Sequence, residues 1–233
     1  MVCALIFAGG HGTRMRSEMP KQFIEVQNKP ILVHTLNVFE NSQIIDKIVV
    51  VTLKEYIDQV LQYAEEFNIT KIAAVIPGGL TAMDSQFNGL EYLMENSEKE
   101  DIVFIHDGVR PFINSELLED CLKCTIQNRN AITVSPATET ISILNEQHNI
   151  KEIFRRQSCV LARAPQVFYL SDIYNAHIKA ASHKNDYVDS ASLMMSLGNK
   201  LNVIEGPVEN IKITTQYDLA LCKLWMKEKY END

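Results

Sequence analysis

The stretch VCALIFAGGHGTRMRSEMPKQF, residues 2–23, begins with an apolar run and leads directly into a glycine-rich loop. The apolar run has the composition of a strand that is buried on both faces, as in a parallel sheet. Gly9, Gly10 and Gly12 let the chain turn tightly and expose successive backbone N–H groups, an arrangement that holds phosphate oxygens. This stretch therefore predicts a sheet with an anion-binding loop at one edge.

Strand and helix patterns go on alternating to about residue 130. Runs rich in Val and Ile predict further buried strands at 46–53, 71–79 and 101–112. Apolar residues three and four positions apart predict helices at 30–42, 55–67, 84–97 and 115–128. We expect Asp84 or Ser85 to cap the third of these helices and Ser115 to cap the fourth. Repeated βαβ units predict an α/β fold with a Rossmann-like, mostly parallel sheet and helices on both faces.

The alternation breaks after residue 130, where extended segments at 131–144 and 149–168 follow each other without a helix. They predict a hairpin excursion that turns near residues 145–149. Helical patterns at 171–183, 189–198 and 217–230 and a strand at 200–206 complete the sequence. Because no linker or internal repeat divides the chain, we expect a single domain, residues 1–233, with an inserted β-arm at about 137–162.

The composition limits the class of protein. The 233 residues are 46% hydrophobic and 22% charged, which excludes disorder as the main state. No apolar run approaches the roughly 18 residues of a membrane span, and the first apolar run lacks a basic leader, so we interpret it as a strand rather than a signal peptide. The net charge of −8 disfavours nucleic acid as a partner but allows a small anion in a locally positive pocket. We therefore expect no membrane and no nucleic-acid partner.

Five scattered cysteines, an odd number, indicate reduced thiols and a cytoplasmic compartment. Cys121 and Cys124 have the spacing of a zinc or redox pair. They lie in a segment of helical periodicity without a second pair or a histidine partner, so we interpret them as structural residues.

Two cations accompany the first loop. Arg14 can bridge two phosphate oxygens, and Lys21 adds a compact charge that we expect to be exposed. A cationic cradle of this kind is what phosphoryl or nucleotidyl transfer requires. The loop lacks the Lys-Ser/Thr ending of a Walker A motif, and Met15 stands where a dinucleotide fingerprint has its third glycine. A glycine-rich turn without a ligand is the remaining alternative.

Six of the nine glycines lie in three loops that follow predicted strands. Besides the first loop, these are the loops that contain Gly78-Gly79 and Asp107-Gly108. Because ligands of open parallel sheets bind at the carboxyl ends of the strands, we expect the three loops to meet at one edge. We interpret His106, at the end of a strand, as a structural residue rather than a general base.

The segment AGGHGTRM followed by PKQF resembles the signature of nucleotidyltransferases that activate sugars and sugar alcohols. The PKQF ending with PIL beyond it is similar to their cytidylyltransferase branch, which includes methylerythritol-phosphate and ribitol-phosphate enzymes. Further matches follow in the family's order at 78–90, 106–112, 137–140, 163–168, 188–192 and 209–219. The resemblance covers essentially the whole chain. It implies a homodimeric enzyme with shared active sites that uses CTP, a small phosphorylated polyol and Mg²⁺.

The resemblance also implies roles for the residues that match the motifs. Arg14, Lys21 and Lys212 would be catalytic groups at the reacting phosphates. The nucleotide would be bound by Ala8, Gly9, Gly10, Gly12, Gly78, Gly79, Ser85 and Asp107. Asp107 would also be the magnesium ligand, because a hard cation prefers carboxylate oxygen. The acceptor would be bound by Arg110, Thr140, Arg156 and Val188, with Arg156 (or its neighbour Arg155) reaching from the dimerisation arm into the other subunit's site.

The sequence departs from the family's pattern mainly around the acceptor. Val188 and Ala164 stand where threonine is usual, and Ala82 stands where many members have arginine. The loss of a hydroxyl partner alters discrimination between substrates. We therefore expect a pentitol phosphate such as ribitol 5-phosphate, for a cell-surface polymer. The alternative is methylerythritol phosphate, for isoprenoid biosynthesis.

Functions of two other classes remain as alternatives. A nicotinamide-dependent oxidoreductase would need the missing third glycine and an acidic residue at the end of the second strand, which instead ends in Thr52-Leu53-Lys54. A catalytically inactive nucleotide-binding regulatory protein would be expected to lose Lys21 or Lys212, and both are present.

Overall fold

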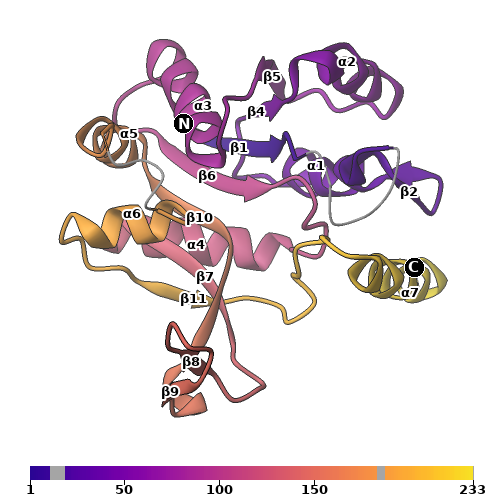
Figure 1. Ribbon diagram of the computed structural model, residues 1–233. Helices are drawn as coiled ribbons and strands as arrows, with labels where there is room; N and C mark the ends of the chain where they lie inside the picture. Colours follow the sequence, from indigo (N-terminus) through magenta and orange to yellow (C-terminus); the bar gives the residue numbers. More distant parts are fainter. Residues whose placement is uncertain (11–18, 183–186, 233) are drawn as a thin grey trace.

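The computed structural model describes residues 1–10, 19–182 and 187–232, the last four as backbone alone. Its centre is a seven-stranded sheet in the order β11-β7-β10-β6-β1-β4-β5 (Figure 1). The strands are β1 (Val2–Ala8), β4 (Lys47–Thr52), β5 (Ile72–Pro77), β6 (Ile102–Asp107), β7 (Asn130–Pro136), β10 (Val160–Tyr169) and β11 (Val203–Glu205). The strand patterns predicted from the sequence thus all fall in one sheet, apart from the arm.

The sheet is mostly parallel, as predicted. β1 pairs in parallel with both β4 and β6, β4 with β5, and β11 with β7. β10 runs antiparallel between β6 and β7. The carboxyl ends of β1, β4, β5 and β6 therefore lie side by side at one edge, where the loops that follow them can build a common site.

Helices cover both faces of the sheet. One face carries α1 (Ile31–Asn41), α2 (Ile57–Glu66) and α4 (Ser115–Asn128), and the other carries α3 (Ala82–Asn96), α5 (Leu170–Lys179) and α6 (Ser190–Ser196). Alternate residues of β6 serve the two faces, since Phe104 packs in the first core and Val103 in the second. Each such fully buried side chain contributes about 1.5–3 kcal/mol. The α/β fold with both faces covered is confirmed.

The final helix, α7 (Gln216–Asn232), packs beside the N-terminal end of α1. Leu219, Cys222 and Met226 are buried against Val26 and Ile31. The spacing of three and four residues puts the three α7 side chains on one face. Val26 belongs to a short hairpin of β2 (Glu25–Val26) and β3 (Lys29–Pro30). The helix predicted at 217–230 is therefore present and packs through one face.

Two helix caps differ from the predicted ones. Thr81, rather than Asp84 or Ser85, caps α3, and the Asp84 carboxylate closes the capping box by accepting from the Thr81 N–H group. Asn114, rather than Ser115, caps α4 by accepting from the Leu117 N–H group. An N-cap needs extended backbone and a side chain that reaches two or three residues ahead. Thr, Ser, Asp and Asn are all good N-cap residues, so residue type alone does not choose between neighbours. The backbone path decides between them.

The arm is a separate hairpin of β8 (Ser142–Leu144) and β9 (Ile150–Ile153), which projects from the body (Figure 1). Its turn lies where predicted, since the Asn145 N–H group donates to the Asn149 carbonyl. A short 3-10 helix, η4 (Arg156–Ser158), leads back to β10. Val160 to Ala162, which we expected in the arm, pair with β7 and extend the central sheet.

Candidate active site at the carboxyl edge of the sheet

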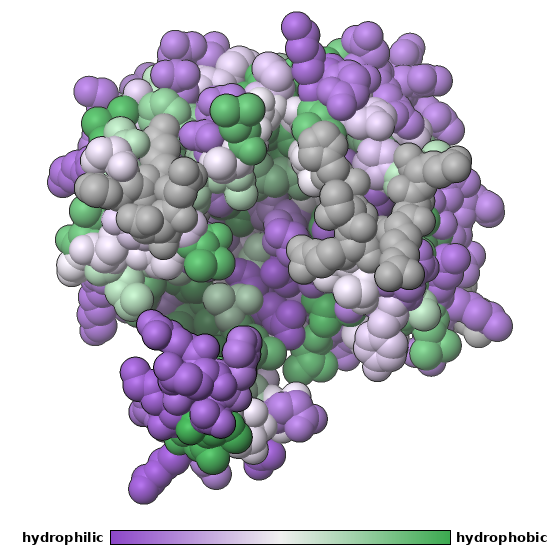
Figure 2. All heavy atoms as spheres, in the orientation of Figure 1, coloured by the Kyte–Doolittle hydropathy of each residue, from purple (hydrophilic) through white to green (hydrophobic). Residues whose placement is uncertain are grey.

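A cavity of about 650 Å³ opens at the carboxyl edge of the sheet. Figure 2 shows it as a hollow with hydrophilic side chains inside. Gly9 and Gly10 from the first loop, Gly79 from the second and Asp107 from the third all line it. The expectation that the three loops meet at one edge is therefore confirmed.

The second glycine loop is packed tightly against the start of α3. The Ser85 hydroxyl accepts from the Gly79 N–H group at 3.0 Å and donates to the Thr81 carbonyl at 2.9 Å. A Cβ at position 78 would lie 2.8 Å from Ser85 Oγ, and one at position 79 would overlap Asp84. Glycine is therefore required at position 79, and an added Cβ at position 78 would displace the Ser85 hydroxyl.

Lys21 lines the cavity but is only 8% exposed, in contrast to the exposed loop residue that we expected. It begins the 3-10 helix η2 (Lys21–Phe23), whose Phe23 ring packs 5.0 Å from the Tyr56 ring. The Gln22 amide donates to the Ala8 carbonyl. The first contact holds the segment against residue 56, which follows β4, and the second holds it against the end of β1, so Lys21 is buried between them.

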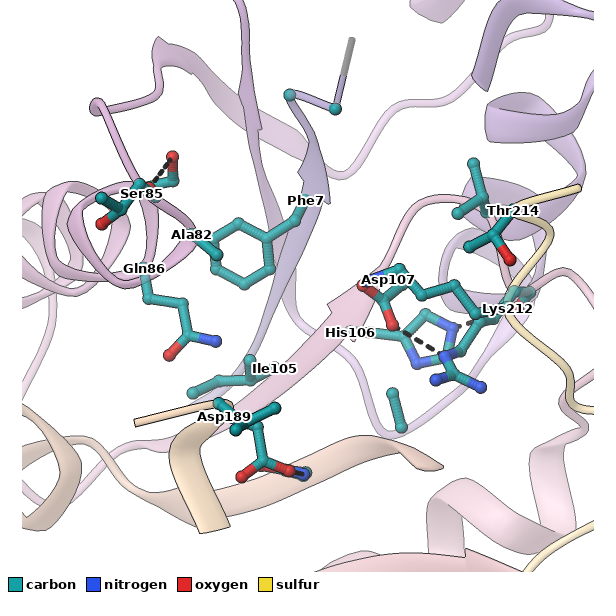
Figure 3. Close-up of a pocket in the computed structure, with 18 of the residues that line it drawn as sticks. Phe7, Ala82, Ser85, Gln86, Ile105, His106, Asp107, Asp189, Lys212 and Thr214 are labelled. Atoms are coloured by element: carbon teal, nitrogen blue, oxygen red, sulfur yellow. Dashed lines mark hydrogen bonds and ion pairs between the residues drawn. The ribbon is translucent and has the colours of Figure 1, made fainter. Parts of the chain in front are cut away.

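Asp107 lies between two cations. Its Oδ2 accepts from Arg110 Nε at 2.7 Å, and its Oδ1 is 2.6 Å from Lys212 Nζ (Figure 3). Burial opposes ionisation of this carboxyl, but Lys212 and Arg110 outweigh it and hold its pKa well below the usual range. The cluster carries a net positive charge because two cations share one carboxylate.

His106 lies beneath this cluster and is 1% exposed. Its Nε2 donates to the Arg110 carbonyl at 3.1 Å, and its ring lies 5.2 Å from the Phe39 ring. Burial lowers the pKa of His106 to about 4, so the ring is neutral near pH 7. These contacts fit the structural role expected for it.

The opposite side of the cavity is formed by the start of α3 and by Val188 and Asp189, which directly precede α6. Figure 3 shows Gln86 and Asp189 there, across from Asp107 and Lys212. The Gln86 carbonyl oxygen accepts from the Ser190 hydroxyl at 2.9 Å, and Asp189 Oδ2 accepts from the Gln166 amide at 2.7 Å. Val188 is 91% exposed at the rim.

The structure brings together most of the residues expected in the site, but not all of them. The cavity is lined by Gly9, Gly10, Lys21, Gly79, Ser85, Asp107, Arg110, Val188 and Lys212. Ala8 and Gly78 lie directly behind the lining, and the exposed Thr140 and Arg156 lie on the arm. Gly12 and Arg14 lie outside the described residues.

Sequence reasoning missed Gln86, Arg163 and Asp189, which also line the cavity. Gln86 directly follows Ser85 in a helix whose first turn was expected at the site, so its position was a usable signal. Arg163 and Asp189 lie in matched motifs, but no spacing rule directs either side chain toward the cavity.

Other site types find no support in the described part of the chain. No group of three or more His, Cys, Asp or Glu residues is placed to hold a metal ion. No described helix has both the length and the hydrophobicity that crossing a bilayer requires. Cys121 and Cys124 are free thiols, and burial raises the pKa of the Cys121 thiol to about 12. A pKa this high makes Cys121 unreactive near neutral pH.

Comparisons with known proteins agree with the geometry. Residues 2–228 match the family model described as IspD: 2-C-methyl-D-erythritol 4-phosphate cytidylyltransferase. The chain is 42% identical over 225 residues to ribitol-5-phosphate cytidylyltransferase of Streptococcus agalactiae serotype III, covering 96% of this chain and 94% of that protein. It is 35% identical to 2-C-methyl-D-erythritol 4-phosphate cytidylyltransferase of Clostridium botulinum (strain Langeland), covering 93% of each.

Solved structures give the same result. The 4-diphosphocytidyl-2C-methyl-D-erythritol synthase of Anaerococcus prevotii superposes with a TM-score of 0.84 at 28% identity, covering 97% of this chain and 96% of that one. The cytidylyltransferase of Francisella tularensis superposes with a TM-score of 0.80 at 28% identity, covering 96% and 99%. With its sequence matched from residue 2 to residue 228 and its fold shared, the chain belongs to the 2-C-methyl-D-erythritol 4-phosphate cytidylyltransferase family of nucleotidyltransferases.

Proposed function

We propose that the protein joins CTP to a pentitol phosphate such as ribitol 5-phosphate, giving a CDP-alditol and pyrophosphate. The observation that carries this proposal is the Asp107–Arg110–Lys212 cluster facing a glycine-lined cavity. Cations there suit two phosphate-bearing substrates, and family membership supplies the type of transfer. Relatives named as ribitol-5-phosphate enzymes are 36–42% identical to the chain, against 35% for those named as methylerythritol-phosphate enzymes.

The reaction needs no general base. A phosphate oxygen of the acceptor, already an anion near neutral pH, forms a bond to the α-phosphorus of CTP. The bond from this phosphorus to the bridging oxygen breaks, and pyrophosphate leaves with the electron pair. The protein must align two anions that repel each other and stabilise the charge on the five-coordinate phosphorus.

Cations on both sides of the reacting phosphorus would supply that stabilisation. Lys21 and Lys212 lie in the cavity, and Arg14 belongs to the first loop. Arg110, oriented by Asp107, would hold the acceptor's phosphate. Thr140 and Arg156 would help to align the acceptor from the arm of the neighbouring subunit.

The nucleotide would lie against the two glycine loops. Gly9 and Gly10 would approach the phosphates, and Gly79 with Ser85 would border the base and ribose. Backbone groups held by the α3 cap can read the edge of cytosine, and a site built to pair one hydrogen-bond pattern rejects a base that lacks it. This is the basis for expecting CTP rather than UTP.

Mg²⁺ would accompany the nucleotide. Asp107 offers the carboxylate oxygen that this ion prefers, although both of its oxygens are already paired with cations. The ion would therefore be held mainly by the nucleotide's phosphates, with Asp107 as its protein ligand. When bound, it would neutralise part of the phosphate charge.

The arm would join two copies of the chain. Its exposed apolar side chains form a surface that the parent sheet does not cover, comprising Ile143, Leu144, Ile150, Ile153 and Phe154. Burying such side chains against a second copy is favourable, and an isologous contact would carry each arm to the other subunit. A homodimer would thereby bring Thr140 and Arg156 to a site that lacks them in its own chain.

The choice of acceptor follows from the rim of the cavity. Val188 offers methyl groups where related enzymes offer a hydroxyl, so one hydrogen bond to a methylerythritol oxygen is missing. Methylerythritol 4-phosphate is the second candidate, favoured by the description of the family model.

The test is pyrophosphate release from CTP or UTP with ribitol 5-phosphate, other pentitol phosphates, glycerol phosphate and methylerythritol phosphate under one set of conditions. We expect ribitol 5-phosphate with CTP to give the highest kcat/KM. Preference for methylerythritol phosphate by tenfold or more would contradict the proposed acceptor. No release with any pair, despite nucleotide binding, would identify an inactive regulatory protein.

A further inference from the structure

Arg163 is a cation of the cavity that has no role in the mechanism above. It lies on β10 within an irregularity of the ladder, since the pairing with β7 shifts between Ala162 and Gln166. The half-buried side chain makes one hydrogen bond to a described residue, from its Nε to the Ser135 hydroxyl at 3.0 Å. This bond fixes Nε of the guanidinium and leaves the two terminal nitrogens, Nη1 and Nη2, without a partner among the described residues.

A chain of hydrogen bonds connects this segment to Arg110. The Asn210 amide donates to the Ala164 carbonyl at 2.6 Å, and the Asn210 carbonyl accepts from Arg110 Nη1 at 2.8 Å. Gln166 lies opposite Ile105 on β6, so Arg163 is carried just past the end of that strand, where Asp107 lies. Arg163 therefore stands on the acceptor side of the cavity, beside Arg110.

The charges around Arg163 do not balance. Asp107, the carboxylate of the cluster, is already shared by Arg110 and Lys212, and no described carboxylate forms an ion pair with Arg163. Burial and the nearby charge of Arg110 lower the pKa of the Arg163 guanidinium from its ordinary value. A positive charge that is partly removed from water and next to another one is stabilised when an anion binds between them.

We propose that Arg163 is a specificity-determining residue that binds the acceptor's phosphate together with Arg110, from within the same subunit. The inference rests on the proposed function and adds a cation to the acceptor site. A guanidinium can hold two oxygens of one phosphate, so this contact favours a phosphate monoester over an uncharged polyol. It compensates for the hydroxyls absent at Ala164 and Val188.

The test compares Arg163→Gln with the wild type in pyrophosphate release. Arg129→Gln is the matched control. Arg129 directly precedes β7, at the edge of the sheet opposite the cavity, and it pairs there with Asp172 of α5. We expect Arg163→Gln to raise KM for ribitol 5-phosphate about ten- to a hundredfold, the scale of one charge-assisted contact. KM for CTP and kcat should change less than about threefold, and inorganic phosphate should lose its competitive inhibition against the acceptor to a similar degree.

Arg163→Lys keeps the charge but cannot bind two phosphate oxygens at once, so it should give an intermediate KM for the acceptor. This variant also tests the inference if Arg163→Gln folds poorly. Unchanged KM for the acceptor in a folded Arg163→Gln protein, or a rise confined to CTP, would overturn the inference. If the wild type turns over no polyol phosphate, the proposed function fails instead. Calorimetry with inorganic phosphate then still tests Arg163, since equal binding by wild type, Arg129→Gln and Arg163→Gln would overturn its role.

Discussion

The two sides of the cavity are assembled over very different distances along the chain. On the side that we assign to the nucleotide, Gly79 bonds to Ser85, six residues ahead, and Thr81 bonds to Asp84, three residues ahead. On the acceptor side, the Arg110 bond to Asn210 spans 100 residues. The bond between Asn210 and Ala164 spans 46.

This difference has a consequence for substrate choice. A local loop and its helix cap form one unit, in which an added Cβ at Gly79 would overlap its neighbour. The acceptor side is a set of single contacts from separate elements, so one side chain can change there without disturbing the others. Two of the three departures from the family lie there, at Ala164 and Val188, whereas the third, Ala82, begins α3 beside the nucleotide loop.

The largest effect is expected on the nucleotide side. Lys21→Ala should lower kcat by about a hundredfold or more, because one charge partner of the transition state is removed. Lys21 is buried, so Lys21→Met serves as a control that keeps the packing of the aliphatic stem. Both variants should show equal loss of turnover and native circular dichroism. Near-normal turnover in either would remove Lys21 from the catalytic groups.

A smaller effect is expected for the arm, which extends the acceptor side across a subunit boundary. Arg156→Ala should lower kcat/KM for the acceptor by about ten- to a hundredfold. Mixing it with Lys21→Ala subunits should restore about a quarter of wild-type activity, because half of the dimers are mixed and each has one complete site. If activity does not return after subunit exchange is verified, Arg156 acts within its own chain or not at all.

A substitution at the rim of the acceptor side should change the preference between acceptors rather than kcat. Val188→Thr restores a hydroxyl and should raise kcat/KM for methylerythritol phosphate relative to that for ribitol 5-phosphate. The expected change in the ratio corresponds to about 1–3 kcal/mol. Val203→Thr, the same change at an exposed position of the edge strand β11, is the matched control. An identical ratio in wild type and Val188→Thr would show that the side chain at 188 does not contact the acceptor.

The smallest effect concerns His106, beneath the point where the two sides meet. Its pKa is about 4 in the folded protein and about 6.5 in an unfolded chain, so the unfolded state binds more protons as the pH falls below 6.5. Stability should therefore decrease with falling pH, by about 0.7 kcal/mol between pH 7 and pH 6. The lowered pKa of Asp107 acts only below the ordinary carboxyl range and does not contribute there. Urea unfolding at both pH values should show this loss of stability in the wild type but not in His106→Gln. An equal pH dependence of the two proteins would show that His106 titrates normally.

The sequence by itself determined the order of the elements and the edge at which the site lies. Buried strands and amphipathic helices repeat with periods that depend on neighbouring residues, and glycines at strand ends mark close backbone approach. These are local properties, so the βαβ units, the hairpin turn and the meeting of Gly9, Gly79 and Asp107 were all predictable. Lys212 came from a motif resemblance, because no local rule connects it to residue 107.

Only the tertiary structure decided which side chains share a charge or a hydrogen bond. The burial of Lys21 depends on packing of Phe23 against Tyr56, and the pairing of Lys212 with Asp107 depends on a loop that returns across the sheet. Arg163 faces the cavity because β10 departs from regular pairing at that point. Electrostatic and hydrogen-bond energies depend on distance in space, and residues a hundred positions apart come within 3 Å only when the whole sheet has formed.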